Sequence, residues 1–115
     1  MKPTEYTPAA KDALSDAEQT AGRLGRTLAG SEHLLLGFFV SKDSIAAKIL
    51  SARGISRDSV MKLMYPDGEE DRQESRKAEG FTPRLLRILE RSAAEASRAS
   101  SFLTGTGHML LSVAS

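Results

Sequence analysis

The sequence has no cysteine, and aromatic residues make up only 5% of its 115 residues. The absence of cysteine excludes disulfide bonds, thiol catalysis and cysteine-based zinc sites. Neither sign of charge predominates, because 16 basic residues face 15 acidic ones and the net charge is +1. The chain therefore lacks the broad basic field that is typical of nucleic-acid-binding domains.

Long apolar segments are absent as well. The longest apolar stretches, residues 34–36 and 38–40, are separated by Gly37, and neither approaches the ~18 residues of a membrane-spanning helix. The first ten residues, MKPTEYTPAA, lack the apolar centre of a signal peptide. We therefore expect a soluble intracellular protein that binds no membrane.

The β-branched residues that favour strands are scarce. Alanine and leucine together number 29, whereas valine and isoleucine number only seven. Because strands are usually rich in β-branched residues and helices favour alanine and leucine, the composition predicts an all-α fold.

Capping residues and apolar spacing divide residues 7–64 into four helices. Thr7 and Pro8 are typical of a helix start, and apolar residues follow at helical spacing up to a stop at Gly25. We expect Ser31 to cap the second helix, Asp43 or Ser44 the third, and Ser56 the fourth. The predicted main core consists of the second and third helices' large apolar residues together with Leu14, namely Leu14, Leu34, Leu35, Phe38, Phe39, Ile49 and Leu50.

Residues 65–80 differ in composition from the rest and are followed by a copy of the first helices. The segment 65–80 has a net charge of −3 and no large apolar residue after Tyr65, which predicts a solvated linker. A shift of 75 residues then aligns residues 6–36 with 81–111 at ten identical positions. This match is an internal repeat. We expect about six helices, since the second repeat stops before the equivalents of the last two helices of the first.

These motifs resemble a known family. The segments LGRTLAGSEHLLLGFF at 24–39 and IAAKIL at 45–50 look like the first repeat of a Clp N-terminal domain, and residues 81–111 look like the second. The Gly-Ser-Glu-His sequence at 30–33 is nearest the ClpC type. The resemblance implies a single Clp N-type domain over residues 1–115, with repeat one at 6–64, the acidic linker at 65–80 and an incomplete repeat two at 81–115.

The resemblance also implies a function. Clp N-terminal domains precede the ATPase modules of bacterial Clp unfoldases in the cytoplasm, and they bind adaptor proteins and protein substrates of the Clp protease in protein quality control. Nothing in the sequence resembles a Walker A motif, so the ATPase modules are not expected in this chain. An alternative is a freestanding Clp N-like regulator that binds adaptors or the unfoldase. A small helical hydrolase is a further alternative, but no motif supports it, and we predict neither enzyme activity nor a cofactor.

Glu32 is the main candidate ligand-binding residue. An acid in the first turn of a helix is often there only because it interacts well with the helix dipole. The alternative is that Glu32 receives a cationic group while helix N–H donors near Ser31 and Gly30 hold an anion. ClpC-type domains bind phosphorylated arginine with the corresponding glutamate, so the resemblance implies a phosphoarginine-like ligand. In repeat two Gly107 replaces this acid, which leaves at most a weaker second site at Thr104 and Thr106.

Three other features have both a structural and a functional interpretation. His33 and His108, the only histidines, occupy equivalent repeat positions, and we expect each to fix a corner between helices rather than bind a metal. An arginine face on the fifth helix is either solvated or a docking surface for an acidic adaptor; it comprises Arg84, Arg87, Arg91 and Arg98. Incomplete repeat two should expose apolar surface for self-association around Met109, Leu110, Leu111 and Val113.

Overall fold

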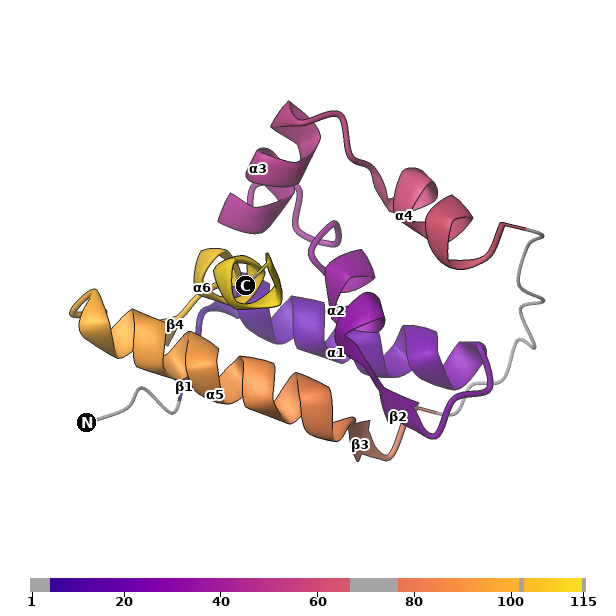
Figure 1. Ribbon diagram of the computed structural model, residues 1–115, viewed down its shortest axis with the longest axis horizontal. Coiled ribbons are helices and arrows are strands. Elements are labelled where there is room, and N and C mark those ends of the chain that lie inside the picture. The colour runs from indigo at the N-terminus through magenta and orange to yellow at the C-terminus, as the bar shows by residue number, and fades with distance from the viewer. Residues whose placement is uncertain (1–4, 67–76, 102, 115) are drawn as a thin grey trace.

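The computed structural model describes residues 5–66, 77–101 and 103–114, and within them the fold is helical, as predicted (Figure 1). Four short strands accompany the helices. In chain order the elements are β1 (Glu5–Tyr6), α1 (Pro8–Arg23), β2 (Leu28–Ala29), α2 (Ser31–Gly37), α3 (Ile45–Ala52), α4 (Arg57–Met64), β3 (Gly80–Phe81), α5 (Pro83–Arg98), β4 (Leu103–Thr104) and α6 (Thr106–Ala114).

The helix starts follow the predicted capping residues with one correction. The hydroxyl of Thr7 accepts a hydrogen bond from the Ala10 N–H at 3.2 Å, and Ser44, not Asp43, caps α3. Ser56 caps α4. The prediction of Ser31 as the cap of α2 was wrong by one residue, because Gly30 is the N-cap and Ser31 is already helical.

The four strands repeat at the same offset as the helices. Strand β1 lies 75 residues before β3, and β2 lies 75 residues before β4. The parallel pairs are β1 with β4 and β2 with β3, so each repeat's first strand pairs with the other repeat's second strand. This exchange fastens both ends of the two repeats to each other, and Figure 1 shows α1 and α5 running side by side between the two strand pairs.

The end of the predicted linker is part of the folded structure. Ala78 is buried in a small cluster with Ala17, Ala21 and Ala29, and its N–H donates to the Glu18 carbonyl at 3.0 Å. Gly80 belongs to β3. The physical reason is that the β2–β3 pairing fixes the residues just before α5. The rest of the linker prediction, at residues 67–76, lies outside the described residues.

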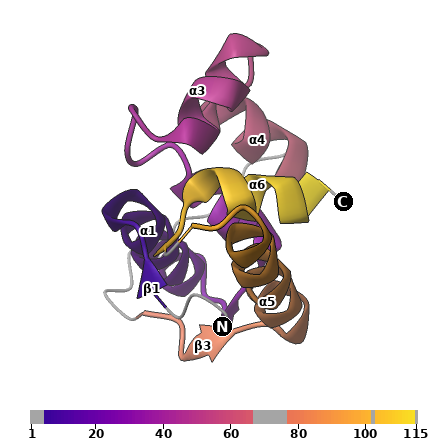
Figure 2. The ribbon, with the colours of Figure 1, turned by 90° about the vertical axis from the view of Figure 1, so that its left-hand side faces the viewer.

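The core forms where α1, α2, α5 and α6 meet, with α3 packed on α6 (Figure 2). Leu14, Leu34, Phe38 and Leu50 are buried there as predicted, and Leu35 and Phe39 pack against them while partly buried. Two predictions were wrong. Ile49 is 43% exposed on the outer side of α3, and Met109, expected on the surface, is fully buried.

The contact between α1 and α2 is unusually close. The face of α1 that meets α2 is lined by alanines, and Gly37 lies at the end of α2. A Cβ added at Gly37 would overlap the carbonyl oxygen of Ala13 and lie 3.1 Å from its carbonyl carbon. The small residues on α1 therefore do what their spacing predicts, since they allow a neighbouring helix to approach the backbone.

Helix α4 is held by Arg57, its first residue. The guanidinium donates to the Asp16 carboxylate at 3.1 Å and to the Leu36 carbonyl at 3.0 Å. It also lies 3.4 Å from the hydroxyl of Thr20. One side chain thus joins α4 to α1 and to the end of α2. None of the helices in the described residues is long and apolar enough to cross a membrane.

Candidate functional site

The start of α2 is organised around His33. The Gly30 N–H donates to Nδ1 of His33 at 2.9 Å, and the imidazole is 1% exposed. The ring thereby replaces the side-chain cap that glycine cannot supply, and it holds the turn between β2 and α2. This geometry agrees with the predicted corner role of His33.

His33 is neutral at pH 7. Burial lowers its pKa below the usual value of 6.5; the negative charge of Glu32 opposes this effect, while the positive charge of Arg26 adds to it. Since Nδ1 accepts a hydrogen bond, the proton of the neutral ring lies on Nε2. The 3.5 Å contact between His33 Nδ1 and Glu32 Oε1 is consequently not an ion pair at this pH.

Glu32 presents its carboxylate at the surface of the same corner. The side chain is 48% exposed, and it folds back over the N-cap, because a Cβ added at Gly30 would lie 2.6 Å from Oε1. The first amide N–H groups of any helix lack acceptors within that helix. An acceptor for a cation and donors for an anion therefore lie together at the start of α2.

The equivalent corner of repeat two has a different surface. His108 accepts from the Gly105 N–H at 2.9 Å, as His33 does from Gly30. The side chain of Thr104 is fully buried, and Thr106 is 3% exposed with its hydroxyl accepting the Ala46 N–H at 3.1 Å. A Cβ at Gly107 would lie 3.0 Å from Cγ2 of Ile45. Helix α3 thus covers the start of α6, and the two threonine hydroxyls expected at a weaker site face the interior.

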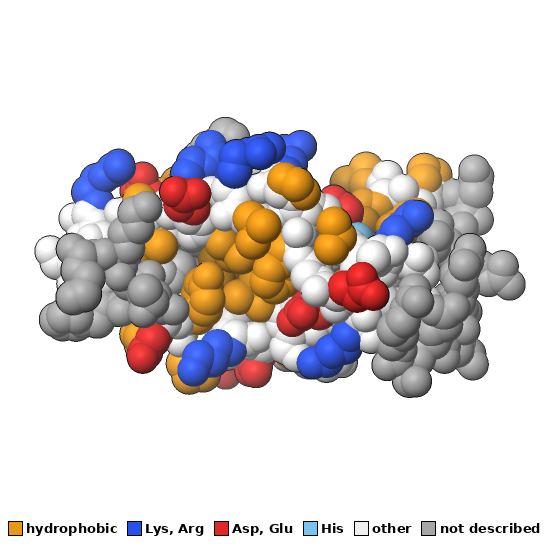
Figure 3. Space-filling model, turned by 90° about the horizontal axis from the view of Figure 1, so that it is seen from below, with side chains coloured by type: hydrophobic (Ala, Val, Ile, Leu, Met, Phe, Trp, Pro, Cys, Tyr) orange, Lys and Arg blue, Asp and Glu red, His pale blue; other side chains and the backbone are white. Residues whose placement is uncertain are grey.

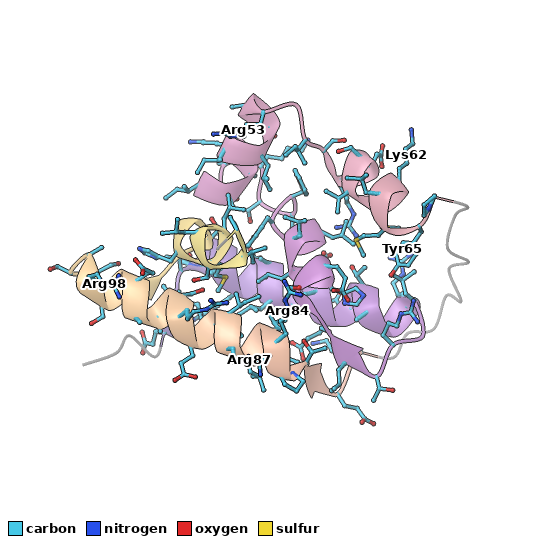
Figure 4. The ribbon with its side chains drawn as sticks, in the orientation of Figure 1. Arg53, Lys62, Tyr65, Arg84, Arg87 and Arg98 are labelled. Atoms are coloured by element: carbon cyan, nitrogen blue, oxygen red, sulfur yellow. The ribbon has the colours of Figure 1, made fainter. Side chains whose placement is uncertain are left out.

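The predicted arginine face lies along α5. All four of its side chains are exposed, and Figure 4 shows Arg84, Arg87 and Arg98 spread along the helix. Arg98 donates to Glu95 at 2.9 Å. Seen from below, the molecule has hydrophobic side chains at its centre with basic side chains along both edges (Figure 3).

The sequence analysis missed one functional feature and placed another imprecisely. Arg57 gave no signal of its bonds to Asp16 and Leu36, because these contacts join residues far apart in the chain. Exposed apolar surface on α6 was predicted, but it belongs to a groove shared with α3 rather than to Met109. Within the described residues, no group of three or more histidine or acidic side chains is placed to hold a metal ion.

Known proteins share both this sequence pattern and this fold. A family model described as Clp repeat (R) N-terminal domain matches residues 5–115. The negative regulator of genetic competence ClpC/MecB of Bacillus subtilis (strain 168) is 34% identical over 109 residues, which cover 92% of this chain and 13% of that protein. The chain therefore corresponds to a small part of that relative's length.

Solved structures agree with this result. The ClpV N-domain in complex with a VipB peptide matches with a TM-score of 0.72 at 19% identity, over 94% of this chain and 66% of that one. The N-terminal domain of the caseinolytic protease associated chaperone ClpD from Arabidopsis thaliana matches with a TM-score of 0.71 at 19% identity, over 98% and 77%. Their likeness is one of fold. Together with the family match, it shows that the chain belongs to the Clp repeat (R) N-terminal domain family.

Proposed function

We propose that this chain is the substrate- and adaptor-recognition domain of a ClpC-type ATP-dependent protease in a bacterial cytoplasm, and that it works by binding rather than catalysis. The relationship to ClpC/MecB supports the ClpC type. A binding role is supported by the ClpV N-domain, which has this fold and was solved with a VipB peptide. In this role the two repeats act as a rigid platform, because the exchanged strands hold both of their ends.

We further propose that the start of α2 binds phosphoarginine on marked proteins. The observation that carries this proposal is the exposed Glu32 carboxylate, folded over Gly30 beside the first-turn amides. Glu32 would accept the guanidinium, while the amides near Ser31 would donate to the phosphate. The neutral His33 adds no repulsion toward the guanidinium and keeps the turn in place. The buried hydroxyls of repeat two favour one strong site over two.

Titration calorimetry with free phosphoarginine tests this site. We expect one strong site in the wild-type chain and at least tenfold weaker binding in Glu32→Ala, a loss of about 1.4 kcal/mol or more. Asp58→Ala is the matched control, because Asp58 is also an acid at the second position of a helix. Full binding by Glu32→Ala, or equal losses in the two variants, would contradict the proposed site.

A further inference from the structure

A second surface with the features of a binding site lies between α3 and α6. The two helices enclose a groove of about 590 Å³. Its described lining consists of one face of each helix: Ile45, Ile49, Leu50 and Arg53 from α3, and Gly107, Leu110, Leu111 and Ala114 from α6. Hydrogen bonding of the Ala46 N–H to Thr106 fixes the two helices against each other at one end. The groove is therefore built into the fold.

The lining is apolar and accessible. Ile45 is 61% exposed, Ile49 is 43% exposed and Leu111 is 56% exposed. Apolar surface of this kind gathered in one place is typical of an interaction site. The lining residues recur at helical spacing along both helices, so they form a seam into which the apolar face of a third helix can pack.

Repeat one contains a short helix in a comparable position. Leu36, which aligns with Leu111, is fully buried, and α4 begins at Arg57 with a bond to the Leu36 carbonyl. Helix α4 has only eight residues. A helix of about two turns therefore suffices to bury this position of a repeat.

The charges differ between the two repeats in a way that selects the occupant. Arg57 of α4 meets the acid Asp16, but the residue aligned with Asp16 in repeat two is the exposed base Arg91. Within the described lining, Arg53 is the one charged residue of the groove. Bases on both sides favour a helix with acidic residues beside its apolar face.

We propose that the α3–α6 groove docks a short, acidic, amphipathic helix of a partner protein. This inference names a partner class for the recognition role proposed above and so rests on it, but it uses a surface separate from Glu32. A second copy of the chain fits the groove less well. A stable interface uses about 20–30 residues a side, and an isologous pairing would bring the same basic lining against itself.

The test uses a labelled helical peptide of about 16 residues, with leucines along one face and glutamates on both flanks. A second peptide carries lysines in place of the glutamates. Fluorescence anisotropy measures the affinity of each peptide for the wild-type chain, Ile49→Ser and Arg53→Glu. The matched controls are Leu63→Ser and Lys62→Glu, because Leu63 is 82% exposed on α4 and Lys62 is exposed near the end of that helix (Figure 4).

We expect the glutamate peptide to bind the wild-type chain, and to bind Ile49→Ser about tenfold more weakly. Arg53→Glu should weaken the glutamate peptide and strengthen the lysine peptide, while both controls bind as the wild type does. No binding of the glutamate peptide, equal binding of both peptides, or equal losses in the controls would overturn the proposal. A dimer in sedimentation that Ile49→Ser dissolves would also overturn it, in favour of a second copy.

The groove and the Glu32 site fail separately. Since Ile49 and Arg53 are exposed, their variants should keep the wild-type melting curve and full phosphoarginine binding. Loss of peptide binding with intact phosphoarginine binding assigns the effect to the groove. Loss of phosphoarginine binding in Glu32→Ala with intact peptide binding assigns that effect to the start of α2.

Discussion

Gly37→Ala should destabilise the fold although it adds only one methyl group. The new Cβ would lie 3.1 Å from the carbonyl carbon of Ala13 and 3.2 Å from its Cα, and would overlap the carbonyl oxygen. Carbon atoms in contact are ordinarily about 3.5–4.0 Å apart. The obstacle is backbone, which cannot rotate away as a side chain can. Helices α1 and α2 would have to separate, which loosens the alanine-lined contact on either side.

The expected loss follows from two opposing effects. Overpacking of a close contact costs about 1–3 kcal/mol, and replacing glycine by alanine in a helix returns at most about 1 kcal/mol. Because Gly37 is the last residue of α2, the gain is smaller than in a helix interior. We therefore expect Gly37→Ala to lower the free energy of unfolding by about 1–2.5 kcal/mol.

Urea unfolding monitored by circular dichroism measures this loss. Gly80→Ala is the control, because the nearest side-chain atom to its new Cβ is 3.8 Å away, an ordinary contact. The control should stay within about 0.5 kcal/mol of the wild type. A Gly37→Ala chain as stable as the wild type, or more stable, would refute the close packing of α2 on Ala13.

Three further predictions concern the core, the corner at α2 and the attachment of α4. Phe38→Ala should cost about 3–5 kcal/mol in urea unfolding because its ring is 1% exposed, and Phe39→Ala should cost clearly less because its ring is only partly buried; equal costs would contradict the burial of Phe38. Burial holds the pKa of His33 below its unfolded value of 6.5, so the unfolded chain binds the proton more readily and stability falls as pH drops below about 6.5. Unfolding at pH 7.5 and 5.5 should show a smaller pH-dependent loss in His33→Gln than in the wild type, and an equal loss would contradict this reasoning. Arg57→Ala should cost about 1–2 kcal/mol through its bonds to Asp16 and Leu36, Arg57→Lys should restore little of it, and hydrogen exchange should show α4 opening before α1.

The local part of the fold could be predicted from the sequence. Helix starts at Thr7, Ser44 and Ser56 depend on a capping side chain and the residues just after it. The offset of 75 residues could also be predicted, because it relates one segment of sequence directly to another. Strands β1 to β4 could not, since two residues are too few for an alternating pattern and their pairing joins distant parts of the chain.

The candidate site was predictable in its residues but not in its surroundings. Glu32 and His33 are adjacent in sequence, so their corner is local. The start of α6 looked similar in sequence, but α3 folds back onto it and gives Thr106 to Ala46. Ile49 was placed in the core for a related reason. Helix α3 is apolar on several sides, and only its packing on α6 decides which side is buried.

The central claim is that this chain recognises proteins marked with phosphoarginine. The most direct measurement compares its affinity for one unfolded polypeptide before and after arginine phosphorylation, with free phosphoarginine as competitor. We predict at least tenfold tighter binding of the phosphorylated polypeptide, an advantage that the competitor removes and Glu32→Ala lacks. Equal affinity for the two forms of the polypeptide would contradict the claim.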